Sequence, residues 1–181
     1  MRVISGIRRG LTLLSPKGEE TRPTTDRVKE NIFNLITGYT VDAKVLDLFS
    51  GSGAMGIEAL SRGAENCVFV DLSRDANEII RKNIEKTKLS DVSQVYQSDF
   101  EKYLINTNEK FSLIFLDPPY HNGFVDKAIS IIEKRGLLTE DGIIVCETDS
   151  DEEIDLLGFS LIKERIYGRV RVRVIGKESL E

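Results

Sequence analysis

The stretch DLFSGSGAMG, residues 47 to 56, links a strand-like run to a helix-like run through closely spaced glycines. Gly51, Gly53 and Gly56 have the spacing G-x-G-x-x-G, which allows a tight turn and a close approach of a ligand to the backbone. Asp71 ends the next strand-like run, 20 residues after Gly51, where an acid commonly binds ribose hydroxyls. The pattern predicts a site for a nucleoside-containing cofactor.

Outward from this stretch, apolar strand-like runs alternate with amphipathic helix-like runs. Such alternation indicates βαβ units, and therefore an α/β fold with a mostly parallel sheet covered by helices on both faces. The expected strands are KVLDLF, NCVFVD, VSQVY, FSLIFL and GIIVCE, and the expected helices cover residues 54–62, 75–87, 99–105 and 124–134.

The two ends of the chain depart from this alternation. Residues 2–16, RVISGIRRGLTLLSP, predict an N-terminal β-hairpin or extension, and a helix is expected to start at Thr25 or Asp26. The run GFSLIKERIYGRVRVRVIG predicts a terminal hairpin with valines on a core face and arginines on a face that is solvated or touches an anion. We therefore expect one domain, 1–181, with an extension (1–40) and a seven-stranded Rossmann-like core (44–176).

The composition is that of an ordinary globular protein. The chain has 181 residues, of which 40% are hydrophobic and 30% charged. Its net charge of -5 argues against nucleic-acid binding over the whole surface, but residues 2–10 and 163–177 are basic and can form a local positive surface if they meet.

Cys67 and Cys146 lie in apolar runs, which predicts reduced core thiols and a cytoplasmic location. We find no signal-peptide pattern and no apolar stretch of membrane-spanning length. No group of His, Cys and acidic residues has metal-ligand spacing, so no metal is expected.

Asp47, which opens the glycine stretch, narrows the choice of cofactor. A carboxylate at this strand end suits a cationic amino group and is poorly placed beside a pyrophosphate. S-adenosylmethionine has that amino group and no phosphates, although NAD would satisfy the glycine spacing as well. Asp99, after the third strand of the alternation, can accept a hydrogen bond from the adenine amine or can simply cap the next helix.

Residues 111–120, FSLIFLDPPY, end a core strand in an acid, two prolines and a tyrosine. Pro118 and Pro119 remove two backbone donors and stiffen the chain. The tip of this strand is expected beside the tip of the first strand, next to the cofactor. The Asp117 carboxylate and the Pro118 carbonyl can each accept a hydrogen from a base amine, and Tyr120 can stack on the base. We interpret the tip as a rigid clamp for a planar amine.

Three stretches together resemble the RsmD family of bacterial ribosomal RNA guanine-N2 methyltransferases. They are DLFSGSGAMGIEALSRGA (47–64), DPPY (117–120) and RPTTDRVKENIFN (22–34). The first two are common to many amino-methyltransferases, whereas RPTTDRVKE is specific. The likeness covers nearly the whole chain, but the N-terminal segment lacks the Gly-Gly pair and the aromatic residue often found in the family.

This resemblance implies a class I S-adenosylmethionine-dependent methyltransferase that modifies the N2 amine of one guanosine in small-subunit (16S) ribosomal RNA. The substrate would be an assembled or assembling subunit, and no stable protein partner is implied. The cofactor residues that it implies are Gly51, Ser52, Gly53, Gly56, Asp71 and Asp99, and the catalytic ones are Asp117, Pro118, Pro119 and Tyr120.

The same resemblance suggests where the RNA binds. Arg22, Thr24, Thr25 and Arg27 match the signature before the core and are expected over the cofactor or RNA entrance, although the threonines can equally serve only as a helix start. Further candidate RNA contacts are Arg8, Arg9 and His121, the last of which can also be a bystander.

Other functions stay open at this point. A nicotinamide-dependent oxidoreductase would tolerate the glycine loop and Asp71, but DPPY and the lack of a separate substrate domain argue against it. A non-catalytic RNA-binding module would not need Asp117. Methylation of adenine N6 in DNA is compatible with DPPY, although no insert remains for a target-recognition region.

Overall fold

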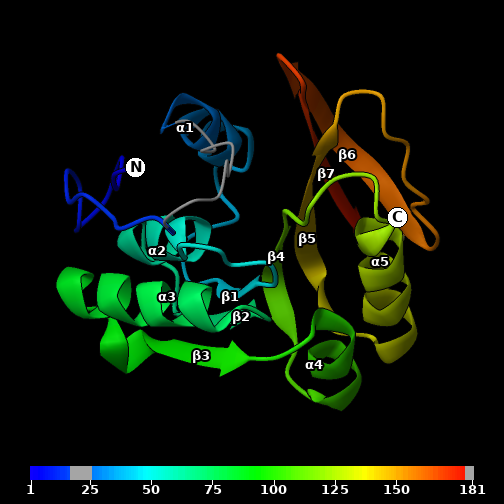
Figure 1. The fold of residues 1–181 in the computed structure, drawn as a ribbon. Coiled ribbons are helices and arrows are strands. Elements are labelled where there is room, and N and C mark those ends of the chain that lie inside the picture. The colour runs from blue at the N-terminus through cyan, green and yellow to red at the C-terminus, as the bar shows by residue number, and fades with distance from the viewer. Residues whose placement is uncertain (17–25, 178–181) are drawn as a thin grey trace.

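The computed structural model describes residues 1–16 and 26–177, and within these residues seven strands form one sheet with helices on both faces (Figure 1). The strand order is β3-β2-β1-β4-β5-β7-β6. The strands are β1 (Lys44–Asp47), β2 (Asn66–Asp71), β3 (Ser93–Gln97), β4 (Phe111–Leu116), β5 (Leu138–Asp149), β6 (Phe159–Tyr167) and β7 (Val170–Lys177). The helices are α1 (Asp26–Leu35), α2 (Ala54–Ser61), α3 (Arg74–Thr87), α4 (Phe100–Asn106) and α5 (Phe124–Arg135), with a short 3-10 helix at Ser90–Val92.

The strand order reverses at β1, which pairs in parallel with both β2 and β4. Asp47, the last residue of β1, is level with Phe69 of β2 and Phe115 of β4. In an open parallel sheet, the strand ends at such a reversal border a crevice that binds ligands. The prediction that the tip of the DPPY strand lies beside the tip of the first strand is confirmed.

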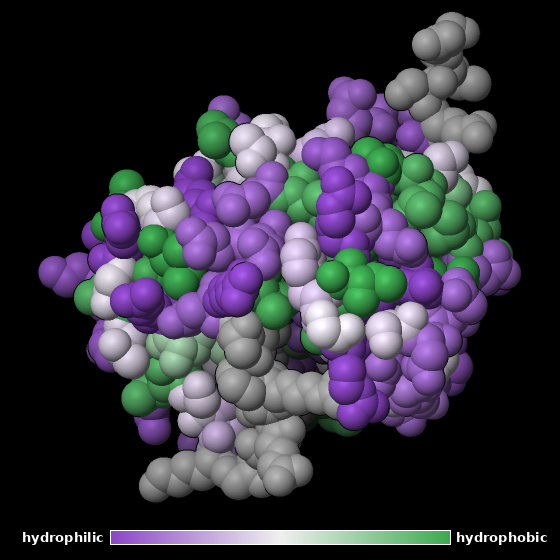
Figure 2. All heavy atoms as spheres, turned by 90° about the horizontal axis from the view of Figure 1, so that it is seen from above, coloured by the Kyte–Doolittle hydropathy of each residue, from purple (hydrophilic) through white to green (hydrophobic). Residues whose placement is uncertain are grey.

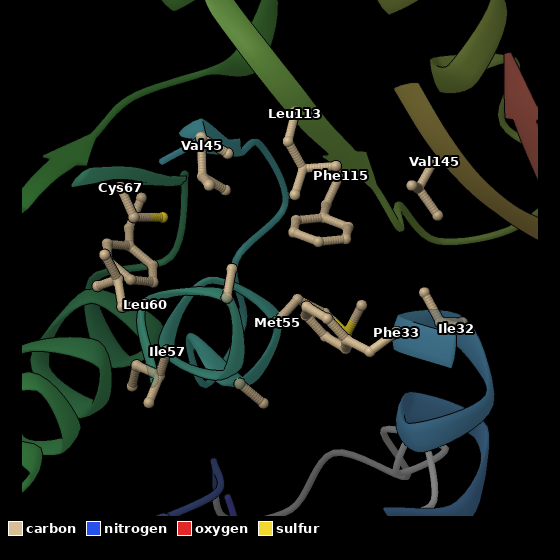
Figure 3. Packing of buried hydrophobic residues seen from close by; sticks show 14 of the residues in the cluster. Ile32, Phe33, Val45, Met55, Ile57, Leu60, Cys67, Leu113, Phe115 and Val145 are labelled. Carbon is tan, nitrogen blue, oxygen red and sulfur yellow. The ribbon is translucent and has the colours of Figure 1, made fainter. Parts of the chain in front are cut away.

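Two apolar layers hold the helices to the sheet, because neighbouring strand residues point to opposite faces. On one face, α1, α2 and α3 pack on a layer that includes Val45 and Phe115, and on the other α4 and α5 pack on a layer that includes Leu46. Figure 3 shows Phe33 of α1 and Met55 of α2 pointing toward Phe115. The rings of Phe33 and Phe115 are 5.7 Å apart, so α1 is packed directly over β4.

The four helices predicted for the core agree with α2 to α5 within one residue at each end. The helix predicted before the core is α1, which buries Ile32, and Ile36 is buried just after its end. Asp26 is the first residue of α1 and accepts a hydrogen bond from the backbone N–H of Arg2 (3.1 Å). Thr25, the other predicted start, lies outside the described residues.

The predicted N-terminal hairpin is reduced to a single antiparallel bridge between Arg2 and Thr12. The backbone between these residues bonds partly to itself, with the N–H of Val3 donating to the carbonyl of Leu11 (2.9 Å) and the N–H of Gly10 donating to the carbonyl of Val3 (2.8 Å), and partly to α2. Ile4 and Ser5 donate their N–H groups to the Glu58 carboxylate (2.8 and 3.0 Å). The segment lies so close to α2 that a Cβ on Gly6 would collide with the backbone of Ser61, the last residue of α2.

The predicted terminal hairpin is formed by β6 and β7, and β7 is antiparallel to both of its neighbours. Val172 and Val174 are buried, as the alternation predicts. Of the two alternatives for the arginine face, contact with anions describes Arg173, which is only 4% exposed. Its guanidinium donates to the Glu164 carboxylate (2.9 Å), and that of Arg171 donates to Glu153 (2.7 Å). These two arginines bind the chain's own acids, so the predicted positive surface gains nothing from them.

Figure 2 shows the molecule from above, on the side of α1 and the tips of β6 and β7, where hydrophilic residues predominate between small hydrophobic groups.

Cys67 and Cys146 are buried and free, as predicted. Among the described residues, no helix is long and apolar enough to cross a membrane. The division of the chain at residues 40 to 44 and the cytoplasmic location stay predictions.

Candidate active site

The glycine loop after β1 is tied to the end of β2 by hydrogen bonds. The N–H of Ser50 donates to the carbonyl of Val70 (3.1 Å), and the N–H of Val70 donates to the Ser50 hydroxyl (3.0 Å). The N–H of Gly51 donates to one oxygen of Asp71, and the N–H of Ser73 donates to the other (both 2.9 Å). Asp71 is thereby fixed at the edge of the loop, and each of its oxygens keeps a second lone pair for a ligand.

Gly53 and Gly56 are glycines for different reasons. Gly53 caps α2 with φ 80°, in the left-handed region where a side chain is strained. Gly56 lies inside α2, where a Cβ would collide with the ring of Phe69 and the sulfur of Cys67 in β2. The first glycine shapes the loop, and the second lets α2 pack closely on the sheet.

Asn83 of α3 is a buried residue that the sequence reasoning missed. Its amide nitrogen donates to the carbonyls of Ser52 (2.8 Å) and Leu14 (3.0 Å), and its oxygen accepts from the N–H of Leu14 (2.8 Å). One side chain therefore joins the glycine loop to the N-terminal segment. Its position three residues after the buried Ile80, on the apolar face of α3, is the signal that could have found it.

Three carboxylates lie just beyond the apolar rows of β1, β4 and β5. Asp47 ends β1, Asp117 follows β4 and Glu147 lies near the end of β5. The register aligns Asp47, Phe115 and Val145, and Asp117 and Glu147 each lie two residues farther along, on the same face. Asp47 and Asp117 are among the residues predicted from the sequence, whereas Glu147 is not.

Burial perturbs all three carboxylates. It raises the pKa of Asp47 to about 7, with repulsion from Asp117 adding to the rise and a hydrogen bond from the N–H of Gly56 (3.0 Å) opposing it. Burial also raises the pKa of Asp117 to about 7. The pKa of Glu147 is raised well above its usual value by burial and by the charges of Asp117 and Asp47. Such a group of acids suits a ligand that brings positive charge or N–H donors.

The turn that follows β4 is braced from within. Pro118 is buried and Pro119 is exposed. The side-chain amide of Asn122 donates to the carbonyls of Tyr120 (2.9 Å) and Pro119 (3.3 Å). In the described part of the chain, no group donates a hydrogen bond to the Asp117 carboxylate or to the Pro118 carbonyl. Both acceptors of the predicted clamp are therefore available to a ligand.

Asp99 and His121 have structural partners. Asp99 caps α4, where its carboxylate accepts from the N–H of Lys102 (3.0 Å), as one of the two readings of the sequence predicted. Its contact with adenine stays a prediction. His121 is exposed, with φ 60°, and its backbone N–H donates to the Glu152 carboxylate (3.2 Å).

His121, Asp149 and Asp151 form a group that the sequence did not reveal, because Asp149 is 28 residues away from His121. One ligand atom from each lies within 4.8 Å of the others. The Asp149 oxygen that lies 3.5 Å from the His121 ring is also 3.4 Å from the guanidinium of Arg169. This guanidinium opposes the binding of a cation, and we assign no metal here.

Arg9 and Arg27, which the sequence places far apart, line one groove of about 560 Å³ together with Arg2 and Arg62. Arg2 lies 3.4 Å from Asp26, and Arg62 is 2.8 Å from Glu58. By contrast, Arg9 and Arg27 form no ion pair with any described residue. The acids Asp26 and Glu30 also line the groove, which therefore presents four guanidinium groups against two carboxylates.

Arg8 and His121, two other predicted RNA contacts, do not line this groove. The guanidinium of Arg8 donates to the carbonyl of Lys88 after α3 (3.3 Å). Arg22 and Thr24 are outside the described residues.

The raised pKa values predict how pH affects stability. Between about pH 4 and pH 7, Asp47 keeps its proton in the folded state and loses it in the unfolded state, so its contribution to stability falls as the pH rises. Asp47→Asn removes this loss. Without ligand, the free energy of unfolding of the Asp47→Asn variant minus that of the unmodified protein should therefore be larger at pH 7 than at pH 5. Chemical denaturation at both pH values measures it, and a difference that stays constant or decreases would contradict the assignment.

The strand order, the glycine loop after β1 and the acids at the ends of β1 and β4 together define the class I methyltransferase fold. In this class the sheet carries one antiparallel strand, here β7, inserted between β5 and β6.

Comparisons with known proteins agree with this class. A family model described as Conserved hypothetical protein 95 matches residues 1–176. The Ribosomal RNA small subunit methyltransferase D of Escherichia coli K12 is 33% identical over 99% of this chain and 91% of its own length. YlbH of Bacillus subtilis, provisionally named an rRNA methyltransferase, is 42% identical over 98% of this chain and 99% of its own. The solved structure of Escherichia coli YhhF, provisionally named a methyltransferase, is 32% identical, with a TM-score of 0.87 over 99% of this chain and 98% of that one.

The chain therefore belongs to the Conserved hypothetical protein 95 family, which is the RsmD family that its sequence resembles.

Proposed function

We propose that this protein transfers a methyl group from S-adenosylmethionine to the N2 amine of a guanosine in 16S ribosomal RNA. The observation that carries the proposal is the pair of acceptors on the turn after β4. The Asp117 carboxylate and the Pro118 carbonyl lie on a stiff turn beside the glycine loop and bond to no donor among the described residues. Relatives named for small-subunit ribosomal RNA support the choice of substrate.

The residues at the crevice fit S-adenosylmethionine. The buried carboxylate of Asp47 suits its amino group, the loop at Gly51 and Gly53 allows close approach, and Asp71 offers acceptors for the ribose hydroxyls. Asp99 lies on the same edge for the adenine. Bound there, the cofactor supplies an electrophilic methyl group on its sulfonium.

The acceptors on the turn address the weakness of the nucleophile. The lone pair of an exocyclic amine is delocalised into the ring of the base. When Asp117 and Pro118 each accept one hydrogen of the amine, the lone pair is left free and directed away from both acceptors. Two acceptors held in place before the reaction lower its barrier, because no reorganisation is needed at that moment. The amine nitrogen gains the methyl group and loses one proton, for which the ionised Asp117 carboxylate is an acceptor.

RNA must also be held by its phosphates, and the groove that contains Arg9 and Arg27 is suited to this. The Arg9→Gln/Arg27→Gln double variant is expected to bind 16S RNA at least about tenfold more weakly, with a salt dependence reduced by about two counterions. Filter binding at several salt concentrations measures both quantities. Lys134→Gln, which removes an exposed cation in the last turn of α5, is the matched control. An unchanged salt dependence in the double variant would exclude the groove as a phosphate site.

The choice of substrate is tested by a transfer assay. The purified protein is mixed with methyl-labelled S-adenosylmethionine and small subunits from a strain that lacks the gene, or with naked 16S RNA, large subunits or DNA in parallel. Label is expected in 16S RNA alone. Label in DNA, or in no RNA despite measured cofactor binding, would refute the substrate and leave the fold assignment standing.

A further inference from the structure

Of the three buried acids at the strand ends, Asp47 belongs to the proposed cofactor site and Asp117 to the proposed clamp, whereas Glu147 belongs to neither. It lies in β5, between β4 and β7 in the sheet, and is level with Val172 of β7. Leu116 of β4 is level with Cys146, so the next residues, Asp117 and Glu147, emerge side by side at the carboxyl edge. Both side chains belong to the face that α1 and α2 cover. Glu147 therefore flanks the proposed clamp on the side away from the cofactor loop.

The burial of Glu147 has no compensation within the protein. The residue is only 3% exposed, and in residues 1–16 and 26–177 no group donates a hydrogen bond to its carboxylate and no cation pairs with it. Its oxygens are not among the fully enclosed polar atoms that lack a partner, so they keep a small access to the surface. Its nearest charged neighbours, Asp117 and Asp47, are acids. A buried carboxyl group without a donor is destabilising and therefore requires an explanation.

The same fold satisfies a different buried acid completely, which makes the contrast informative. Glu58 is 0% exposed, and its carboxylate accepts from the N–H groups of Ile4 and Ser5 and contacts the cations of Lys29 and Arg62. Glu147 has none of these partners although it is almost as deeply buried. This difference points to a donor that arrives from outside the protein.

The chemistry of the substrate identifies that donor. On the Watson–Crick edge of guanine, the N2 amine lies next to the N1–H group, which is also a donor. In adenine, N1 carries no hydrogen and is an acceptor. If Asp117 and Pro118 hold the N2 amine, an acceptor beside Asp117 on the same edge of the sheet faces N1–H.

We propose that Glu147 is a substrate-recognition residue whose carboxyl oxygen accepts the N1–H of the target guanine. This inference rests on the proposed function. The raised pKa of Glu147 agrees with it, because a protonated carboxyl group still accepts through its carbonyl oxygen and can donate to guanine O6. Reading N1–H beside the reacting amine would let the site select guanine over bases that lack it.

The test compares guanosine with 2-aminopurine at the methylated position of 16S RNA assembled by ligation. This analogue keeps the amine but has no hydrogen on N1 and no O6. The unmodified protein is expected to prefer guanosine by at least about 100-fold in kcat/KM, since a site built to bond a polar group rejects an analogue that lacks it. Glu147→Met is expected to reduce this preference to less than about tenfold, mainly through slower methylation of guanosine.

Two further readouts separate recognition from a structural role. Glu147→Gln keeps a carbonyl acceptor and should keep most of the preference for guanosine. Glu147→Met should unfold at the same or a higher denaturant concentration than the unmodified protein, because it removes a buried acid without a partner. A folded Met variant that slows both substrates equally, or a folded Gln variant that loses the preference, would overturn the assignment. If the unmodified protein does not methylate guanosine N2 at all, the proposed function fails instead.

Discussion

Replacing Asp117 by alanine is expected to lower the single-turnover rate of methyl transfer by a factor of at least about 10²–10³, which is the range found when one preorganised polar group is removed from a reaction centre. The reason is that the amine loses one of its two fixed acceptors. Because Asp117 follows β4 and the glycine loop follows β1, the affinity for S-adenosylmethionine should stay within a few fold. Rapid-quench measurement of the transfer and calorimetry of cofactor binding give the two quantities.

Asp117→Asn is the matched control for this prediction. Asparagine has nearly the same shape and keeps one acceptor oxygen, so it should retain more activity than alanine does. An alanine variant with full activity would exclude the clamp. An alanine variant that loses cofactor binding and transfer together would mean that Asp117 holds the cofactor rather than the base.

Replacing Glu58 by glutamine is expected to lower the free energy of unfolding by about 3–5 kcal/mol, the usual result of breaking a buried ion pair by removing one partner. Lys29 and Glu58 are both 0% exposed and 3.2 Å apart. Burial lowers the pKa of Lys29, and the charge of Glu58 opposes this effect. The variant leaves the ammonium group of Lys29 buried beside a neutral amide. Urea denaturation monitored by circular dichroism measures the loss.

Two variants show whether this loss comes from the buried pair. Glu78→Gln breaks an exposed pair with Arg74 in α3, where both side chains are more than half exposed, and should change stability by less than about 1 kcal/mol. Adding Lys29→Met to Glu58→Gln removes the stranded charge and should restore part of the stability. A Glu58→Gln protein as stable as the Glu78→Gln protein would show that the N-terminal segment and α1 do not depend on this pair.

The parts of the fold that follow from local patterns could be predicted from the sequence. The glycine loop, α2 to α5 and the β6–β7 hairpin each depend on residues close together in the chain, whose spacing is visible directly. The N-terminal segment turns back on itself as its sequence predicts, but its docking on α2 could not be predicted, because the N–H groups of Ile4 and Ser5 bond to Glu58, more than 50 residues away.

The candidate site shows the same division. Asp47 and Asp117 stand at the ends of strand-like runs next to unusual residues, so their types and positions reveal them. Glu147 ends an apolar run in a way that is equally typical of a strand reaching solvent. It is buried because β7 inserts beside β5, and the pairing of a strand from the end of the chain is not visible from local spacing. Arg173 is buried for the same reason, since it is level with Cys146 of β5 and its guanidinium donates to the Thr148 hydroxyl of that strand (3.1 Å).

The identity of the methylated nucleoside is the most direct test of the proposed chemistry. Small subunits from a strain that lacks the gene are incubated with the protein and S-adenosylmethionine, and their 16S RNA is digested to nucleosides for mass spectrometry. We expect N2-methylguanosine at a single position, absent when Asp117→Ala replaces the unmodified protein. Methylation at another atom, such as a ring nitrogen, a ribose oxygen or adenine N6, would contradict the assignment of the turn after β4 as a clamp for the guanine amine.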